Sequence, residues 1–233
     1  MAQIFHPASN TIAKASIFGA VFVMLGVLWF TAEMVRSSYF TETNVAQAQP
    51  VMFSHEHHVS GLGLDCRYCH TSVEDAAFAG MPSTKTCMTC HSQIWTNAQI
   101  LEPVRASWRN DKPIQWNRVN DVPDFVQFNH GIHVQKGIGC YECHGNVAGM
   151  PLMWKAHSLQ MEWCLDCHLA PEKYIRPRDQ VFNIAPWTPG EGKSRIEAGR
   201  ELVKQYHVRS EMIGDDPHEK LPKPITNCSK CHY

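Results

Sequence analysis

Ten cysteines, the whole cysteine content of this 233-residue chain, fall into five copies of the pattern Cys-x-x-Cys-His. The five copies are Cys66, Cys69 and His70; Cys87, Cys90 and His91; Cys140, Cys143 and His144; Cys164, Cys167 and His168; and Cys228, Cys231 and His232. Two thiols three positions apart can each form a thioether with one porphyrin, while the adjacent histidine ligates the iron. The pattern therefore predicts five covalently bound haem c groups, each with one histidine ligand from its own motif.

Two other uses of paired cysteines fit this sequence less well. Zinc sites usually combine two Cys-x-x-Cys pairs at a suitable spacing, and they do not require a histidine after every pair. A disulfide framework gives no reason for that histidine either. Five identical motifs with no cysteine left over therefore favour haem attachment.

Each low-spin haem iron also needs a second axial ligand, usually histidine or methionine. The phrase "FSHEHHV" at 53–59 precedes the first motif, and the similar "FNHGIHV" at 128–134 precedes the third. If these phrases are helical, histidines three positions apart share one face, and the residue between them points away. The alignment thus predicts four distal ligands and leaves His57, which aligns with Ile132, without a role. The four predicted ligands are His55, His58, His130 and His133.

The fifth iron must take its distal ligand from outside these phrases. Met150, His157, Met161 and His207 are the candidates, and we favour Met150 because one histidine–methionine haem could be a high-potential exit. With all five irons doubly ligated, no position stays open for a substrate. The residues therefore indicate an electron relay with no catalytic residues of its own.

The spacing of the motifs predicts how the chain is organised. The first cysteines, at 66, 87, 140, 164 and 228, form two close pairs and a single. We interpret residues 53–91 and 128–168 as a duplicated two-haem unit, with the fifth haem at 228–232. The expected fold is mainly α-helical and irregular, rich in loops, with porphyrins forming much of the core.

Two helices are expected outside the motifs. The segment between the two units carries three tryptophans and three prolines, which predicts at most one short helix near Thr96 to Leu101. A longer helix is expected from about Ser194 to Tyr206, where Ser194 and Glu197 form a capping-box pattern.

The N-terminal region predicts a membrane anchor. From Ala15 to Ala32 there are 18 residues without a formal charge, about the length of a membrane-spanning helix. The sequence "AQA" at 46–48 resembles a signal-peptidase site but lies well beyond the apolar run, so we expect an uncleaved anchor. Because haem c is attached outside the cytoplasm, we expect a cytoplasmic N-terminus and a single transmembrane anchor at 1–36, a linker at 37–50 and a periplasmic pentahaem domain at 51–233. The net charge of −1 argues against nucleic-acid binding.

The combination of "FxHxxH" with a following "CxxCH" resembles the small class III multihaem cytochromes. In that family the first histidine ligates the haem of the following motif, and the second reaches a neighbouring haem. The resemblance implies that His55 pairs with His70 and His130 with His144. His58 and His133 would then serve other haems.

Longer phrases resemble the pentahaem cytochrome c subunit of alternative complex III, from about residue 4 to the end. They include "PVMFSHEHHVSGLGLDCRYCHTSVE", "AGMPSTKTCMTCHSQIWTNA", "LEPVRASW" and "MEWCLDCHLAPE". In that family the complex of the bacterial inner membrane oxidises a quinol and passes electrons to a soluble cytochrome c, a blue-copper protein or an oxidase. The resemblance implies an iron–sulfur subunit, polytopic quinol-binding membrane subunits and a monohaem cytochrome c as partners.

Two other hypotheses are kept. The chain could be a stand-alone membrane-anchored quinol dehydrogenase that feeds a periplasmic reductase, or a haem-bearing storage module without a defined electron route. Quinol oxidation by the isolated chain would favour the first of these. A graded redox titration in which all haems respond to quinol would exclude the second.

Overall fold

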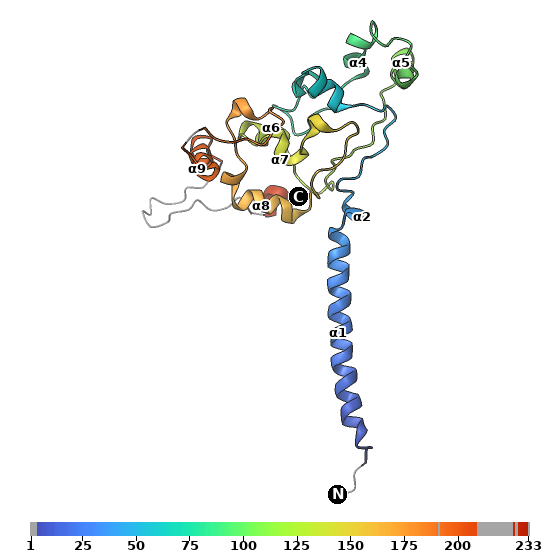
Figure 1. The fold of residues 1–233 in the computed structure, drawn as a ribbon, viewed down its shortest axis with the longest axis vertical. Helices are drawn as coiled ribbons and strands as arrows, with labels where there is room; N and C mark the ends of the chain where they lie inside the picture. Colours follow the sequence, from blue (N-terminus) through green and yellow to red (C-terminus); the bar gives the residue numbers. More distant parts are fainter. Residues whose placement is uncertain (1–3, 191, 209–225, 227, 233) are drawn as a thin grey trace. The chain divides into compact units, whose positions relative to one another are not determined.

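The structure is a computed structural model that describes residues 4–190, 192–208, 226 and 228–232. The chain divides into two compact units, Met1–Thr43 and Asn44–Tyr233 (Figure 1). Each unit is described by itself below.

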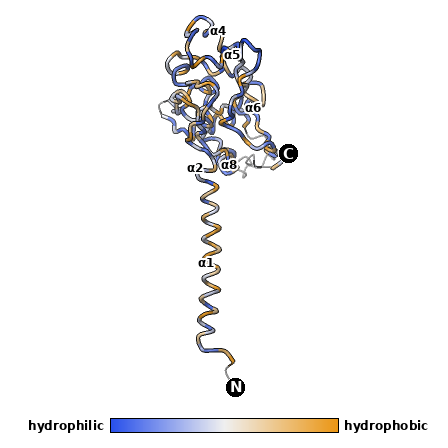
Figure 2. Tube along the Cα trace, turned by 90° about the vertical axis from the view of Figure 1, so that its right-hand side faces the viewer, coloured by the Kyte–Doolittle hydropathy of each residue, from blue (hydrophilic) through white to orange (hydrophobic). Residues whose placement is uncertain are grey.

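The first unit is dominated by one long helix, α1, which spans Ala8–Arg36 and is followed by the short α2, Ser38–Thr41. Its 29 residues extend over about 43 Å at 1.5 Å per residue. Hydrophobic residues recur along α1 (Figure 2), and its most apolar part has a mean hydropathy of 2.1 with no residue buried. Helix α1 is therefore long and apolar enough to cross a membrane, as the sequence predicts, and a signal sequence would share these properties.

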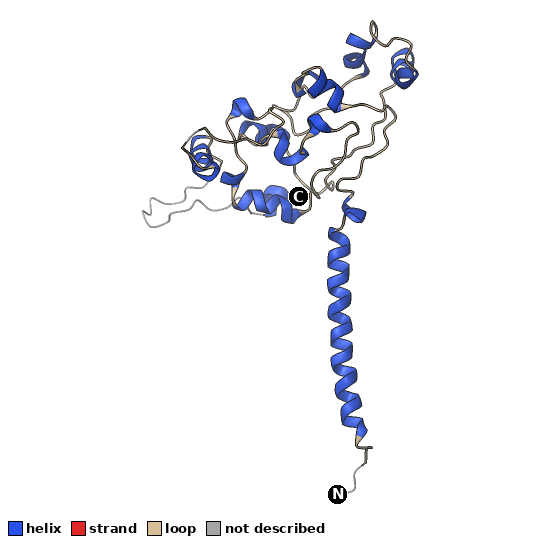
Figure 3. Cartoon of the chain, in the orientation of Figure 1, coloured by secondary structure: helices blue, strands red, loops and turns tan. Residues whose placement is uncertain are grey.

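The second unit consists of short helices joined by loops, with no strand among its described residues (Figure 3). Its helices, including 3₁₀ and π turns labelled η, are η1 Glu56–Gly61, α3 Cys66–Cys69, α4 Thr84–His91, η2 Gln99–Leu101, α5 Glu102–Asn110, α6 His130–Gln135, α7 Cys140–His144, η3 Val147–Gly149, α8 Met161–Leu169, η4 Pro171–Lys173, η5 Arg178–Gln180, α9 Arg195–Gln205 and α10 Cys228–Cys231. Isolated antiparallel bridges join Ala46 to Trp154, Val126 to His232 and Ile138 to Ile175. The mainly helical and irregular fold expected from the sequence is confirmed for this part of the chain.

All five cysteine motifs form helical turns, in α3, α4, α7, α8 and α10. In a helix, residues three positions apart lie on one face, so each turn presents both thiols to the same side. At the first motif the Asp65 carboxylate caps the turn by accepting a hydrogen bond of 2.8 Å from the Arg67 backbone N–H. The motifs thus have the local conformation that attachment of one porphyrin requires.

The two helices expected outside the motifs differ in outcome. Helix α9 has the predicted capping box: the Ser194 hydroxyl accepts from the Glu197 N–H, and the Glu197 carboxylate accepts from the Ser194 N–H. The segment between the two proposed two-haem units is more helical than predicted, because the 3₁₀ turn η2 continues into the nine-residue α5. Pro103 lies in the first turn of α5, where a missing N–H costs no hydrogen bond, so the proline starts this helix instead of preventing it.

Few large apolar side chains of the second unit are fully buried. The largest fully buried side chains by volume are those of Arg176, Met150, Ile175 and Val181, and the largest of these is an arginine. A small hydrophobic cluster of Ile138, Ile175, Val203 and Tyr206 packs against Cys143 and Cys167. This cluster joins α9 to the cysteine-bearing helices α7 and α8.

Candidate functional site

The two histidine phrases make reciprocal contacts within the second unit. In the second phrase, the backbone N–H groups of His130 and Gly131 donate to the carbonyls of Ala77 and Ala76, in the loop that follows the first cysteine motif. In the first phrase the Glu56 N–H donates to the Met150 carbonyl, and the hydroxyl of Ser60, the residue after the phrase, donates to the Ala148 carbonyl; both carbonyls lie in the loop that follows the third motif. The phrase at 128–134 therefore contacts the loop after the first cysteine motif, and the phrase at 53–59 contacts the loop after the third.

Gly131 makes this contact possible. A Cβ at this buried position would lie 2.9 Å from the Glu74 carbonyl oxygen, so the helix and the loop approach too closely for a side chain. The corresponding position of the first phrase, Glu56, is exposed. The close approach explains why the two phrases differ at their fourth position, Glu56 in the first and Gly131 in the second.

Three histidine pairs have nearly the same spacing. Ring centroids are separated by 6.4 Å for His130 and His144, 6.2 Å for His133 and His168, and 6.3 Å for His58 and His91. His55 lies close enough to His70 for a positive charge on His70 to lower its pKa. Each pair joins one histidine of a phrase to one histidine of a cysteine motif.

This spacing fits two imidazoles on opposite sides of one iron. Metal–imidazole bonds are about 2 Å long, so two of them plus the radius of each ring, about 1 Å, place the ring centres roughly 6 Å apart. The three measured spacings agree with that value, and the rings of His130 and His144 are parallel within 2°. The residues present therefore fit a histidine–iron–histidine arrangement.

Hydrogen bonds at Nδ1 orient most of these imidazoles. His58 bonds the Ser54 carbonyl at 2.8 Å, and His133 bonds the Asn129 carbonyl at 2.7 Å, four residues back in each phrase. His70 bonds the Gly80 carbonyl at 2.7 Å, and His130 bonds the Ala77 carbonyl at 2.9 Å. A carbonyl can only accept, so Nδ1 carries the proton and Nε2 keeps the lone pair that a metal requires.

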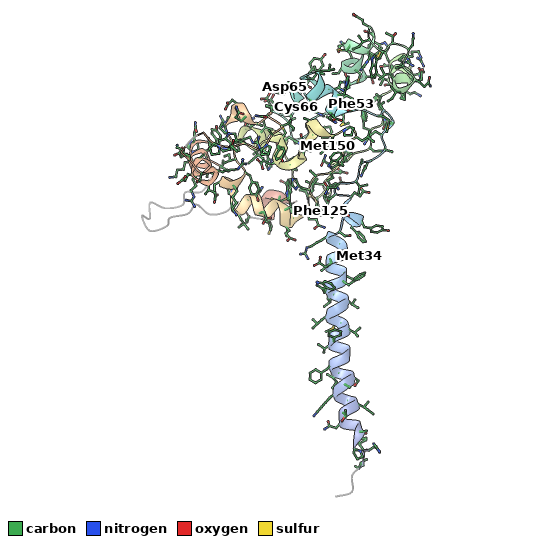
Figure 4. The ribbon with its side chains drawn as sticks, viewed as in Figure 1. Met34, Phe53, Asp65, Cys66, Phe125 and Met150 are labelled. Atoms are coloured by element: carbon green, nitrogen blue, oxygen red, sulfur yellow. The ribbon has the colours of Figure 1, made fainter. Side chains whose placement is uncertain are left out.

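Two aromatic rings fix the phrase histidines further. Phe53 stacks on His58 at 4.3 Å and meets His55 edge-on at 4.9 Å (Phe53 is labelled in Figure 4), and Phe128 does the same for His133 and His130 at 4.7 Å each. The phenylalanine that opens each phrase thus holds both histidines of that phrase in place.

Burial keeps these histidines neutral. It lowers the pKa of His55 and of His144 to about 4, and it lowers the pKa of His58, His130 and His133 from the ordinary value near 6.5. Nearby histidines contribute a smaller part of most of these shifts. Neutral imidazole is the form that ligates a metal, so the environment suits ligation at neutral pH.

The cysteine pairs of different motifs neighbour one another in a series. A thiolate at Cys90 would raise the pKa of Cys69, and the Cys66 and Cys140 thiols lie close enough to shift each other's pKa. Burial and, to a smaller extent, proximity to Cys167 raise the pKa of Cys143 to about 12, and burial and proximity to Cys231 raise the pKa of Cys164. The motifs are therefore neighbours in the order 87–91, 66–70, 140–144, 164–168 and 228–232.

The candidates for the fifth distal ligand lie in different surroundings. Met150 has 1% of its surface exposed, and its methyl group would lie 4.0 Å from a Cβ on Gly145, which follows the paired His144. His157 stacks on Trp163 at 5.2 Å, whereas Met161 is 62% exposed. The exposed His207, with φ of +48°, lies just after α9, which ends at Gln205.

His232, the ligand from the fifth motif, contacts another part of the unit. Its ring packs at 5.6 Å on Phe125, and Figure 4 shows Phe125 and Met150 at separate places in the second unit. The assignment of Met150 to the fifth iron stays a prediction. His57, expected to have no role, is exposed and stacks on Trp95 at 6.0 Å.

Sequence reasoning missed a buried charge cluster at the third motif. Arg176 is completely buried and donates to the Glu142 carboxylate at 2.6 Å, and Arg195 donates to the same oxygen at 2.7 Å. Glu142 occupies the second variable position of "CYECH", between Cys140 and Cys143. A glutamate inside the motif is the only sequence signal for this cluster, and it does not identify the arginines.

Comparisons with known proteins agree with the haem interpretation. The sequence profile of the class III cytochrome c family matches residues 32–115, which include the first histidine phrase and the first two cysteine motifs. The chain is also 33% identical over 127 residues to the menaquinone reductase multihaem cytochrome c subunit of Nitratidesulfovibrio vulgaris (strain Hildenborough). That match covers 54% of this chain and 56% of the relative. The chain is therefore similar to multihaem cytochromes c over about half its length.

Proposed function

We propose that this chain is the electron-relay subunit of a membrane quinol:acceptor oxidoreductase, with five c-type haems in its second unit. The observation that carries the proposal is the set of three histidine pairs with ring spacings of 6.2–6.4 Å, each joining a phrase to a cysteine motif, with His55 near His70 as the proposed fourth pair. When bound, haem supplies a one-electron carrier whose potential depends on its ligands and surroundings. The cysteines of each motif would attach it, and the histidine pairs would ligate the iron and leave no ligand position for a substrate.

The neighbouring order of the motifs supports a relay. The sites form a series whose ends are the motifs at 87–91 and 228–232, and the Cys66–Cys140 contact lies at its centre. Cys66 and Cys140 are the first cysteines of the two proposed two-haem units. The reciprocal loop contacts of the histidine phrases hold these two motifs together, so the proposed duplication accounts for the middle of the series.

The setting of the relay is also proposed. Helix α1 would anchor the chain in the bacterial inner membrane, with the haem domain on the periplasmic face where haem c is attached. The proposed partners are an iron–sulfur subunit, polytopic quinol-binding subunits and a monohaem cytochrome c, as in alternative complex III. A soluble cytochrome c or a blue-copper protein would be the acceptor.

The similarity to a menaquinone reductase subunit supports a second candidate, in which the same relay carries electrons toward a quinone. The two directions are separated by an assay on the complex purified from membranes. The first predicts that added menaquinol reduces the haems. The second predicts that a reduced periplasmic cytochrome does so, and that added menaquinone reoxidises them.

The composition of the purified material tests the subunit role. Co-purification with an iron–sulfur protein and polytopic subunits is expected. Quinol oxidation by the isolated chain would instead support the stand-alone quinol dehydrogenase and contradict the proposal.

A further inference from the structure

Two buried nitrogen atoms without a hydrogen-bond partner among the described residues lie at the third cysteine motif. His144 Nδ1 and Arg176 Nε are both buried, and neither has a hydrogen-bond partner in the described parts of the chain. Arg176 lies directly against the motif, because a Cβ on Gly139, the residue before Cys140, would collide with its guanidinium.

The charge of the arginine cluster is positive. Two guanidinium groups share one carboxylate, so Arg176, Arg195 and Glu142 together carry a net charge of +1. Arg176 is held there by further bonds from Nη1 to the carbonyls of Asn183 and Ala185, each 3.0 Å long. A positive charge in a buried site is screened little, and it disfavours the oxidised, more positive form of a nearby iron.

The imidazole of His144 acts in the same direction. A hydrogen bond from Nδ1–H to an acceptor makes an imidazole a stronger electron donor, which stabilises oxidised iron. His130, His133, His58 and His70 all bond a backbone carbonyl in this way, at 2.7–2.9 Å. His144 has no such acceptor among the described residues, so it is the weaker donor of its pair.

Among the described residues, the other three motifs that pair with phrase histidines have at most one of these two features. His55, which pairs with His70, also has a buried Nδ1 without a partner, but the arginine at that motif, Arg67, is 48% exposed and pairs with Asp65. Cys167 lies near Glu142 and shares the charge cluster, but the Nδ1 of His168, the histidine of that motif, is not among the buried nitrogen atoms that lack a partner. Among the described residues, the two effects therefore combine at Cys140–His144.

We propose that His144 and the Arg176–Glu142–Arg195 cluster make the haem held by Cys140 and Cys143 the most easily reduced of the four haems with two histidine ligands. This inference rests on the proposed histidine pairing. It places the highest potential among these four inside the series, so that electrons entering from either end would be held near its centre.

The test is an EPR-monitored redox titration of the full-length protein in its membrane complex. The variant His130→Ala, which removes the proposed partner of His144, identifies the low-spin component of this haem as the one that disappears. In the unchanged protein that component is expected to be reduced first among the bis-histidine components. If it is reduced after any of them, the inference is overturned although the pairing stands. If no component disappears in His130→Ala, the pairing itself fails.

Charge variants test the cause. Arg195→Gln removes the excess charge and leaves the Arg176–Glu142 pair neutral, so the ratio of reduced to oxidised haem at a given potential should fall on the order of tenfold, or about 59 mV for one electron. Arg195→Lys keeps the charge and should retain the potential. Arg200→Gln, an equal change at an exposed position of α9, is the control. Equal shifts for Arg195→Gln and Arg200→Gln would overturn the proposed cause.

Discussion

Replacement of His133 by alanine should make one of five haem irons high-spin while all five haems stay attached. The His133 ring centroid lies 6.2 Å from that of His168, and covalent attachment depends on Cys164 and Cys167, which the substitution does not change. The variant also loses a hydrogen bond to Asn129, about 1 kcal/mol, and stacking on Phe128, about 0.5–1.5 kcal/mol. A drop of roughly 2 kcal/mol in the free energy of unfolding is therefore expected in addition to the lost iron bond.

EPR and visible absorption spectra of the purified variant measure the effect. About one fifth of the iron should become high-spin, and added imidazole should restore the low-spin signal by occupying the space that His133 leaves. The matched control is His57→Ala, which removes an exposed histidine one position from His58 and should leave every iron low-spin. An unchanged low-spin spectrum of His133→Ala, with five haems attached, would refute the ligand assignment.

Three further predictions follow from single positions. Gly131→Ala should destabilise the second unit by about 1–3 kcal/mol, because the new Cβ would lie 2.9 Å from the Glu74 carbonyl oxygen; a denaturant midpoint equal to that of the original protein would contradict this close approach. Ser194→Ala should lower the free energy of unfolding by about 1 kcal/mol, because it removes the cap of α9. Thermal unfolding measures the effect, with Glu201→Gln as the control, and equal midpoints for the two variants would argue against the cap. Met150→Leu should abolish the near-infrared band typical of methionine-ligated haem if Met150 ligates the fifth iron, and retention of such a band would exclude it.

The sequence predicted the local features of this protein well. The spacing of Ser194 and Glu197 was enough to predict the capping box, because both partners lie within one turn. Comparison of the two histidine phrases separated His57 from its neighbours, and the structure places it exposed at the surface. The capping box was confirmed because its interactions are local, whereas the absence of a ligand role for His57 stays a prediction.

Contacts between distant segments were not predictable in the same way. The proximity of Arg176 and Arg195 to Glu142 depends on how loops fold back over more than 30 residues. Helix α5 was not predicted, because the three prolines of its segment argue against a long helix, although Pro103 at the first turn of α5 has no such effect. The reciprocal contacts of the two histidine phrases also depend on the tertiary fold, and only the glycine at position 131 gives a local indication of them.

The central claim is that five cysteine motifs carry doubly ligated haems and leave no iron open to a substrate. One measurement tests it most directly: the mass of the purified chain, combined with its EPR spectrum before and after exposure to carbon monoxide in the reduced state. We predict a mass increase of five haems, a fully low-spin spectrum and no carbon monoxide adduct. Fewer than five haems, or a high-spin iron that binds carbon monoxide, would contradict the account of this chain as a relay.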